Sequence, residues 1–342
     1  MRDVLLMILI SQKKFAWLLI LIAISITAIA ALPFIGMELI SVNQLLTDQF
    51  QRDIFLTLRL PRVLTAFLAG GGLAVCGLVF QGLFRNPMAD PYTLGIASGA
   101  SFGASAVILS GAVGTVLLGI TVPTAAIGAL CGAALSFTLV LAFSGAISQP
   151  ADRAAPSSPH TILLAGIAVS FFFSSLLMFL QYISDMRESF HIVRWLMGGV
   201  DVFGYKPLFT MLPFVTVGLV LTAAKVTVLD HFLTGEDIAQ TRGVRVRRSR
   251  NLLLCAASVT VGGIVSVCGP ICFVGMMVPH FCRSMFGASH KILLPACLMA
   301  GGIFLSICDT FARTAIAPAE IPVGVITALL GGPFLVWVSR RR

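Results

Sequence analysis

The chain has 342 residues, of which 58% are hydrophobic and only 11% are charged, and its formal net charge is +9. Soluble domains contain roughly 45–50% apolar and about 25% charged residues, and here no Asp, Glu, Lys or Arg lies between Asp90 and Asp152. A water-soluble fold is therefore excluded, and an integral membrane protein is predicted. The positive charge does not require nucleic acid as a partner, because it gathers on the predicted inner face, beside anionic lipid.

Pro, Gly and charged residues divide the sequence into ten apolar segments, each predicted to be a membrane-spanning helix. The expected fold is an all-α, polytopic membrane protein that forms a single transmembrane domain over residues 1–342. The first segment has features of a secretory signal, but its apolar run from Phe15 to Leu32 is too long for one, so a retained helix is expected. The predicted spans are residues 15–35, 63–84, 93–112, 121–144, 161–183, 206–224, 251–268, 270–284, 292–308 and 321–338.

The distribution of Lys and Arg orients these spans. With the N-terminus inside, most of the 23 basic residues fall on the inner side, as the positive-inside rule requires. Merging the short eighth span with the seventh would move Arg283 and Lys291 to the outside and abolish this asymmetry. We therefore keep ten spans, with a break at Cys268-Gly269-Pro270, and expect both termini in the cytoplasm.

Charged groups at membrane depth are missing from the predicted spans. An ion-coupled carrier usually places titratable side chains there, because a proton relay or counter-ion site needs them. A membrane-embedded enzyme acting on a lipid-linked substrate, the other alternative, would show a cluster of Asp or His at a membrane edge. The sequence also lacks a Gly-Lys dipeptide and hence a Walker A loop, so ATP-driven transport would need a separate ATPase chain.

Charged clusters stand at both ends of the second span. Arg59-Leu60-Pro61-Arg62 precedes it, and Arg85-Asn86-Pro87-Met88-Ala89-Asp90-Pro91 follows it. Taken alone, arginines at a helix end are anchors in the membrane interface, and the second cluster is a helix end stopped by proline.

Small residues recur at every fourth position in the third and fourth spans. The third span contains Gly95, Gly99 and Gly103, and the fourth contains Gly128 and Gly132. Because such repeats let two helix backbones approach closely in lipid, these spans are expected to pack against other helices through their glycines.

The inner loop at about 230–250 is predicted to contain a short cytoplasmic helix. Thr234 with Asp237 three positions later fits a capping box, and Gly243 fits a C-terminal stop. A two-turn helix presenting Ile238 and Ala239 would suit a groove on a partner protein. An amphipathic helix held by anionic lipid is the alternative.

These motifs resemble those of the FecCD family, the permease subunits of ABC importers for iron-siderophore, haem and cobalamin. The RxPR sequence, the Asn86-Pro87-Met88-Ala89-Asp90-Pro91 turn, the Leu94-Gly95 helix start and the G-E-x-x-A-x-x-x-G-V pattern of the inner loop occur in the order typical of that family. The resemblance implies an ABC type II importer permease without a catalytic residue, cofactor or metal site of its own. Ferric siderophore is the expected cargo, with haem or cobalamin as alternatives.

The resemblance also implies partners and sites. The expected partners are two ATPase subunits, one periplasmic binding protein, a second permease subunit (a copy or a related chain) and lipid of the bacterial inner membrane. Docking of the binding protein is assigned to Arg59, Arg62 and Arg313, because the arginine fork can hold a carboxylate in a bidentate pair. Coupling to the ATPase is assigned to Gly235, Glu236, Ile238, Ala239, Gly243 and Val244. The cytoplasmic gate is assigned to Asn86 and Met88 and to the inner loop around Ser144 and Gly145.

Overall fold

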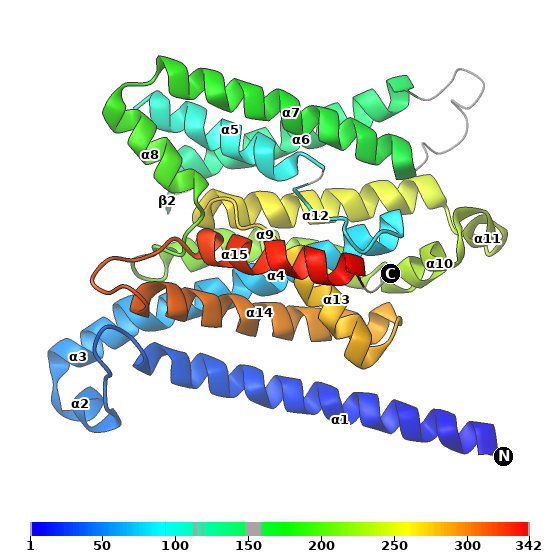
Figure 1. Ribbon diagram of the computed structural model, residues 1–342, viewed down its shortest axis with the longest axis horizontal. Coiled ribbons are helices and arrows are strands. Elements are labelled where there is room, and N and C mark those ends of the chain that lie inside the picture. The colour runs from blue at the N-terminus through cyan, green and yellow to red at the C-terminus, as the bar shows by residue number, and fades with distance from the viewer. Residues whose placement is uncertain are drawn as a thin grey trace.

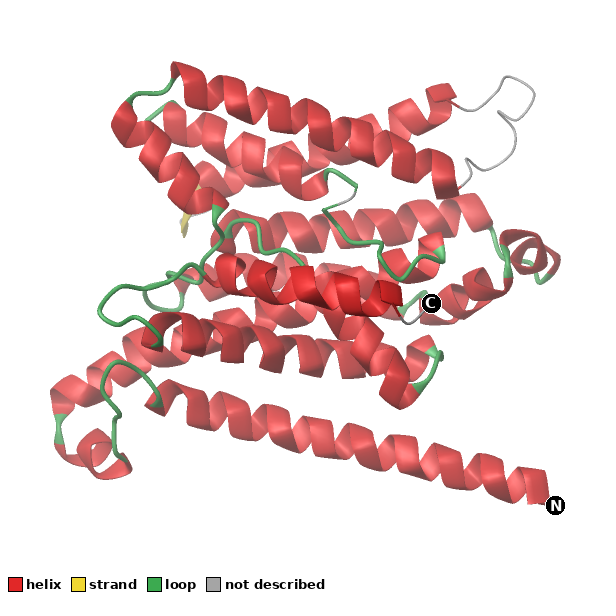
Figure 2. Cartoon of the chain, viewed as in Figure 1, coloured by secondary structure: helices red, strands yellow, loops and turns green. Residues whose placement is uncertain are grey.

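The protein is a bundle of long helices that run side by side (Figure 1). The structure is a computed structural model, and it describes residues 2–340 except 93, 112–114, 118–119, 123 and 148–158. Within the described ranges, regular structure is helical apart from one short hairpin, in which β1 (Thr115–Leu117) pairs antiparallel with β2 (Ile120–Val122) (Figure 2). The predicted all-α membrane fold is therefore confirmed.

Ten of the helices correspond one to one with the ten predicted spans. They are α1 (Arg2–Ala31), α4 (Leu60–Phe84), α5 (Ile96–Leu109), α6 (Thr124–Ile147), α7 (Pro159–Ile183), α9 (Lys206–Ala223), α12 (Val246–Cys268), α13 (Val274–Phe286), α14 (His290–Thr314) and α15 (Val323–Arg340). Seven of them are long and apolar enough to cross a bilayer, whereas α5, α13 and α15 do not meet that length and hydropathy criterion. That α5, α13 and α15 also cross the membrane, which would give ten crossings in all, stays a prediction.

Shorter elements connect the long helices. Before α4 lie the 3-10 turn η1 (Leu32–Phe34), α2 (Val42–Thr47), α3 (Gln49–Ile54) and the π-helical turn η2 (Phe55–Arg59). Later in the chain lie α8 (Met186–Leu196), α10 (Val226–Thr234) and α11 (Glu236–Thr241).

The two ends of the bundle carry different elements. Helices α10 and α11 lie at one end, toward which both ends of the chain also point, and α2, α3 and α8 lie at the opposite end (Figure 1). We call these the α11 end and the α3 end. Because the two ends of the chain point the same way, an even number of crossings is supported.

Helix α4 forms the centre of the bundle. Most of its most apolar stretch is buried inside the protein, and it contacts α9, α12, α13 and α14. In contrast, α1 lies at the edge of the bundle (Figure 1), and only 6% of the most apolar window between Lys14 and Phe34 is buried. A helix that is apolar on every side, as α4 is, is buried in this way, whereas α1 can meet lipid directly.

Glycines set the contact between α5 and α6. A Cβ on Gly103 would lie 2.0 Å from the carbonyl oxygen of Gly128, and one on Gly132 would lie 2.0 Å from that of Gly99. Only glycine fits these positions, so the predicted close packing is confirmed for this pair. Gly95 instead adopts a positive φ of 73° at the start of α5 and faces Ser170 of α7.

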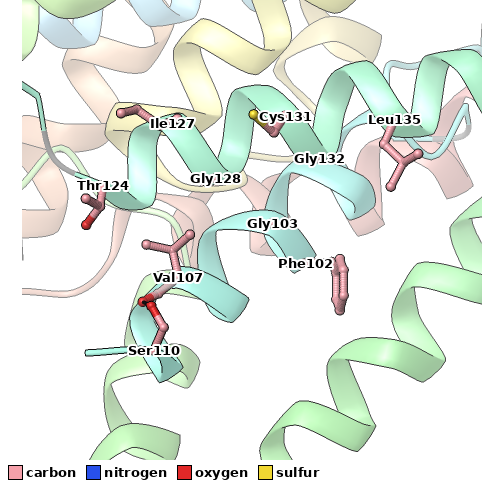
Figure 3. A pocket seen from close by; sticks show the side chains of 10 residues that line it. All are labelled: Phe102, Gly103, Val107, Ser110, Thr124, Ile127, Gly128, Cys131, Gly132 and Leu135. Carbon is pink, nitrogen blue, oxygen red and sulfur yellow. Dashed lines mark hydrogen bonds between the residues drawn. The ribbon is translucent and has the colours of Figure 1, made fainter. Parts of the chain in front are cut away.

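An apolar groove of about 520 Å³ lies beside this glycine contact (Figure 3). Phe102 and Val107 of α5 and Ile127 and Leu135 of α6 line it together with the glycines. Its lining is almost entirely hydrocarbon, as expected for a surface that faces lipid tails.

Two helices extend beyond their predicted spans and enclose charged residues. Helix α14 continues to Thr314, past the predicted end at 308, so Asp309 and Arg313 are helical and buried. Helix α12 begins at Val246 rather than 251, so Arg250 lies inside its first turns. The predicted start at 251 and the predicted end at 308 are therefore wrong, and each of the three charged residues has a partner on another element.

Candidate functional site

An arginine and acid network occupies the α3 end of the bundle. Arg62 of α4 donates from Nε to Oδ2 of Asp309 at 3.0 Å and from Nη2 to Oδ1 at 3.1 Å, and its Nη1 donates to Glu320 at 2.8 Å. The Arg62 side chain is 13% exposed and that of Asp309 is 1% exposed. Such a bidentate, charge-assisted contact fixes α4 against α14.

Arg59 and Arg313 bind backbone carbonyls at the same end. Arg59 donates to the carbonyl oxygens of Phe34 at 3.2 Å and of Glu38 at 2.8 Å. Arg313 is buried and donates from Nη2 to the carbonyl oxygen of Leu32 at 3.1 Å. Both arginines therefore hold the segment that follows α1.

The structure brings all three predicted docking arginines to one place. Arg59, Arg62 and Arg313 line a single cavity of about 280 Å³, together with Glu320 and Gly36. They do not form the open, unpaired patch that their sequence positions suggest, since each already has a partner inside the chain. Docking of another protein stays a prediction.

The short helix at the α11 end begins and ends at glycines. Gly235, with φ of 121°, precedes α11, and Gly243, with φ of 80°, ends the turn that follows it. The predicted stop at Gly243 is confirmed. The predicted capping box is wrong, because the Thr234 hydroxyl donates to the carbonyl oxygen of His231 and Gly235 occupies the N-cap position.

The two residues predicted to face a partner differ in exposure. Ile238 is 46% exposed, whereas Ala239 is fully buried. The carbonyl oxygen of Ala239 accepts from the Val244 N–H at 3.0 Å, so Ala239 closes the turn against its own chain. The expectation that Ala239 is presented outward is therefore wrong, since its side chain belongs to the buried core and α11 packs against α10 and α12.

The Asn-Pro turn after α4 is tightly bonded. Asn86 accepts from the Met88 N–H at 3.0 Å, and both side chains are half-buried at the α11 end. Asp90 accepts from the Tyr92 N–H at 2.9 Å, and burial raises the pKa of the Asp90 carboxyl to about 6. The turn is thus an ordered element, as a gate would need to be.

The other predicted gate residues do not lie in a loop. Ser144 and Gly145 belong to α6, which continues to Ile147, and Ser144 is buried. The predicted loop is wrong at these two positions because the helix runs past the expected end at 144. The Pro-rich segment 148–158 lies outside the described residues.

Two polar contacts at the α11 end were not predicted. Asp230 of α10 bonds to His290 of α14, and Glu236 of α11 pairs with Arg250 of α12. Nothing in the local sequence indicates these pairs, because their members come from different helices. The described residues contain no group of three or more His, Cys, Asp or Glu that could hold a metal ion.

The comparisons with known proteins agree with this architecture. The FecCD transport family matches residues 15–341, and the chain belongs to that family. It is 38% identical over 286 residues to the cobalamin import system permease BtuC of Halobacterium salinarum, covering 84% of this chain and 73% of that protein. It is 34% identical over 326 residues to the hemin transport system permease HmuU of Yersinia pestis, covering 95% of both chains.

A solved structure has the same fold. It is an inward-facing transporter assigned to the metal-chelate type of ABC transporter, with a TM-score of 0.85 and 29% sequence identity. The match covers 96% of this chain and 99% of the other. The bundle of this chain therefore has the fold of that transporter chain.

Proposed function

We propose that this chain is the membrane permease of an ATP-driven importer that moves a metal chelate from the periplasm to the cytoplasm. The match to the FecCD transport family over residues 15–341 carries this conclusion. The sequence has no Walker A loop, so ATP hydrolysis falls to two separate ATPase subunits. Relatives named for cobalamin and hemin transport support a chelate as cargo, with a ferric siderophore as a third candidate of the same class.

Coupling to the ATPase is assigned to the α11 end. Ile238 gives an exposed apolar side chain to a helix that is bounded by Gly235 and Gly243 and paired to α12 through Glu236. A short helix held this firmly can enter a groove on a partner and move as a unit. With this end in the cytoplasm, both ends of the chain are cytoplasmic as well.

Docking of a periplasmic binding protein is assigned to the α3 end. The cavity that contains Arg59, Arg62 and Arg313 holds three guanidinium groups and the single carboxylate of Glu320. An acidic side chain of the binding protein entering it would meet three guanidinium groups, of which that of Arg62 already binds Asp309. Because Glu320 is exposed, it can yield its place beside Arg62 to that side chain.

The pathway requires a second permease subunit, which is either a copy of this chain or a related chain. Helices α7 and α15 expose large apolar side chains, among them Phe171, Met178 and Leu329. We assign the contact with the second subunit to these two helices, with the chelate passing between the two subunits. Asn86 and Met88, half-buried at the α11 end, are assigned to the cytoplasmic gate.

Reconstitution tests the proposal. The chain would be placed in proteoliposomes with its ATPase and binding protein, and uptake of haem, cobalamin and a ferric siderophore would be measured with ATP inside. We expect accumulation of one chelate that requires both ATP and the binding protein. Uptake driven by an ion gradient without ATP would overturn the proposal in favour of a carrier, and failure with all three chelates would overturn the cargo class.

A further inference from the structure

The coupling segment is tied to the start of α14 through one carboxylate oxygen. Asp230 Oδ1 accepts from the backbone N–H of His290 at 2.9 Å and from its Nδ1–H at 2.7 Å. His290 is the first residue of α14 and is fully buried. Asp230 therefore caps α14 from a different helix, satisfying one of the N–H groups that a helix start leaves unpaired.

A second tie joins the coupling segment to α12. Glu236, the first residue of α11, forms an ion pair with Arg250, whose side chain is 3% exposed. A charge-assisted contact that is shielded from water in this way is stronger and more directional than one at the surface. The pair fixes where α11 lies relative to α12.

Apolar packing alone would not define this position. Leu229 and Phe232 of α10 are buried and attach the segment to the bundle. Burial of apolar surface is non-directional, so it allows the segment to slide or rotate. The two polar contacts are directional, so they fix the position of the segment. One of them binds it to α14 and the other binds it to α12.

Helix α14 connects the two ends of the molecule. It starts at His290, which is tied to Asp230 at the α11 end, and near its other end Asp309 is paired with Arg62 at the α3 end. Pro295 removes one backbone N–H donor near the start of α14, but the helix is otherwise continuous between the two contacts, so a movement of His290 is passed along it by the remaining backbone hydrogen bonds.

We propose that Asp230 and His290, together with Glu236 and Arg250, are positioning residues that transmit the movement of α11 into α14 and α12. The inference rests on the proposed function, in which α11 binds the ATPase. It assigns to the Asp230–His290 contact the role of linking ATPase closure to the arginine network at the docking end.

The test uses the full importer in proteoliposomes, with ATP inside and the ATPase and binding protein bound. The measured quantity is the amount of chelate transported per ATP hydrolysed, which loss of assembly alone does not change. D230A removes the acceptor for both His290 bonds, and we expect this ratio to fall about tenfold, within the range of known coupling energies. D230N keeps an acceptor oxygen, so it should restore most of the ratio, and D237N on exposed Asp237 is the matched control.

The second tie gives an independent measurement if D230A does not fold. The single reversals E236R and R250E should each lower the ratio, and the double reversal should restore at least part of it. The inference is overturned if D230A and D230N give the same ratio of chelate transported to ATP hydrolysed. It is also overturned if the double reversal gives the same ratio as the single reversals E236R and R250E. If the ATP hydrolysis of the wild-type complex did not depend on the binding protein, the proposed function would be overturned instead.

Discussion

Arg62 and Asp309 lie 247 positions apart in the chain and form a bidentate ion pair at the α3 end of the bundle. The pair joins α4, the most buried helix, to α14 in a place where neither charge has ready access to water. Desolvation makes each charge expensive on its own, so the two depend on each other.

Removing one member of this pair should destabilise the protein. We expect Asp309→Ala to lower the free energy of unfolding by about 3–5 kcal/mol, because Arg62 would keep a largely buried charge with only exposed Glu320 and Asp201 beside it. Thermal unfolding of the detergent-solubilised chain measures the effect. Glu320→Gln is the control and should cost about 1 kcal/mol or less, since Glu320 is exposed. Equal losses in the two variants would contradict this account.

The exposed side of α11 makes a separate prediction about coupling. Ile238→Asp should weaken ATPase binding by about 2 kcal/mol or more, roughly 30-fold, because it places a charge in an apolar contact. Affinity of the purified ATPase for permease in nanodiscs is the measurement. Asp237→Asn, on a neighbouring exposed side chain, should leave the affinity close to that of the wild type. Ala239→Asp should instead destabilise the loop itself, because Ala239 is buried.

The orientation of the bundle can be tested by labelling. Single cysteines at exposed Arg242 and Lys291 should react with a membrane-impermeant reagent only from the cytoplasmic side, and one at exposed Asp201 only from the periplasmic side. The background must lack the eight native cysteines. Periplasmic labelling at position 291 would mean that α13 does not cross the membrane.

Local features of the sequence predicted the helices well. Long apolar runs ended by Pro, Gly or charge are local signals, so each predicted span has a helix in the structure. The ends were less certain, as Ser144 and Asp309 show, because a helix continues wherever a partner satisfies its polar groups. Periodic glycines such as Gly99 and Gly103 also predicted close packing correctly.

Contacts between distant segments could not be predicted from the sequence. The partners of Arg62 and His290 are set by how α4, α10 and α14 meet, and one sequence holds no signal for that. The burial of Ala239 depends on how α11 packs against α10 and α12. The residues of the family motifs lie at the two ends of the bundle, but the motifs did not indicate which of their side chains already have partners.

The buried carboxyl of Asp90 predicts a pH dependence of stability. Burial raises its pKa to about 6 from the ordinary value of 3.8, so between these values the folded protein keeps a proton that the unfolded chain releases. Stability should therefore fall as pH rises from about 4 to about 6, by about 3 kcal/mol in all. Asp90→Asn removes the titration while keeping an acceptor for the Tyr92 N–H. Between about pH 4 and about pH 6 the unfolding midpoint of the wild type should fall relative to that of Asp90→Asn. Parallel curves for the two proteins would refute the prediction.

The contact between α5 and α6 predicts a strong effect of a single methyl group. In Gly132→Ala the added carbon would lie 2.0 Å from the carbonyl oxygen of Gly99, so the two helices must separate. We expect a loss of about 1–3 kcal/mol in stability, typical of overpacking. Gly145→Ala in α6 is the matched control: nothing lies within 4 Å of its added carbon, and alanine should stabilise the helix by about 0.5–1 kcal/mol. Unfolding of both variants in the same detergent decides between packing and propensity, because a general intolerance of alanine would lower the stability of both.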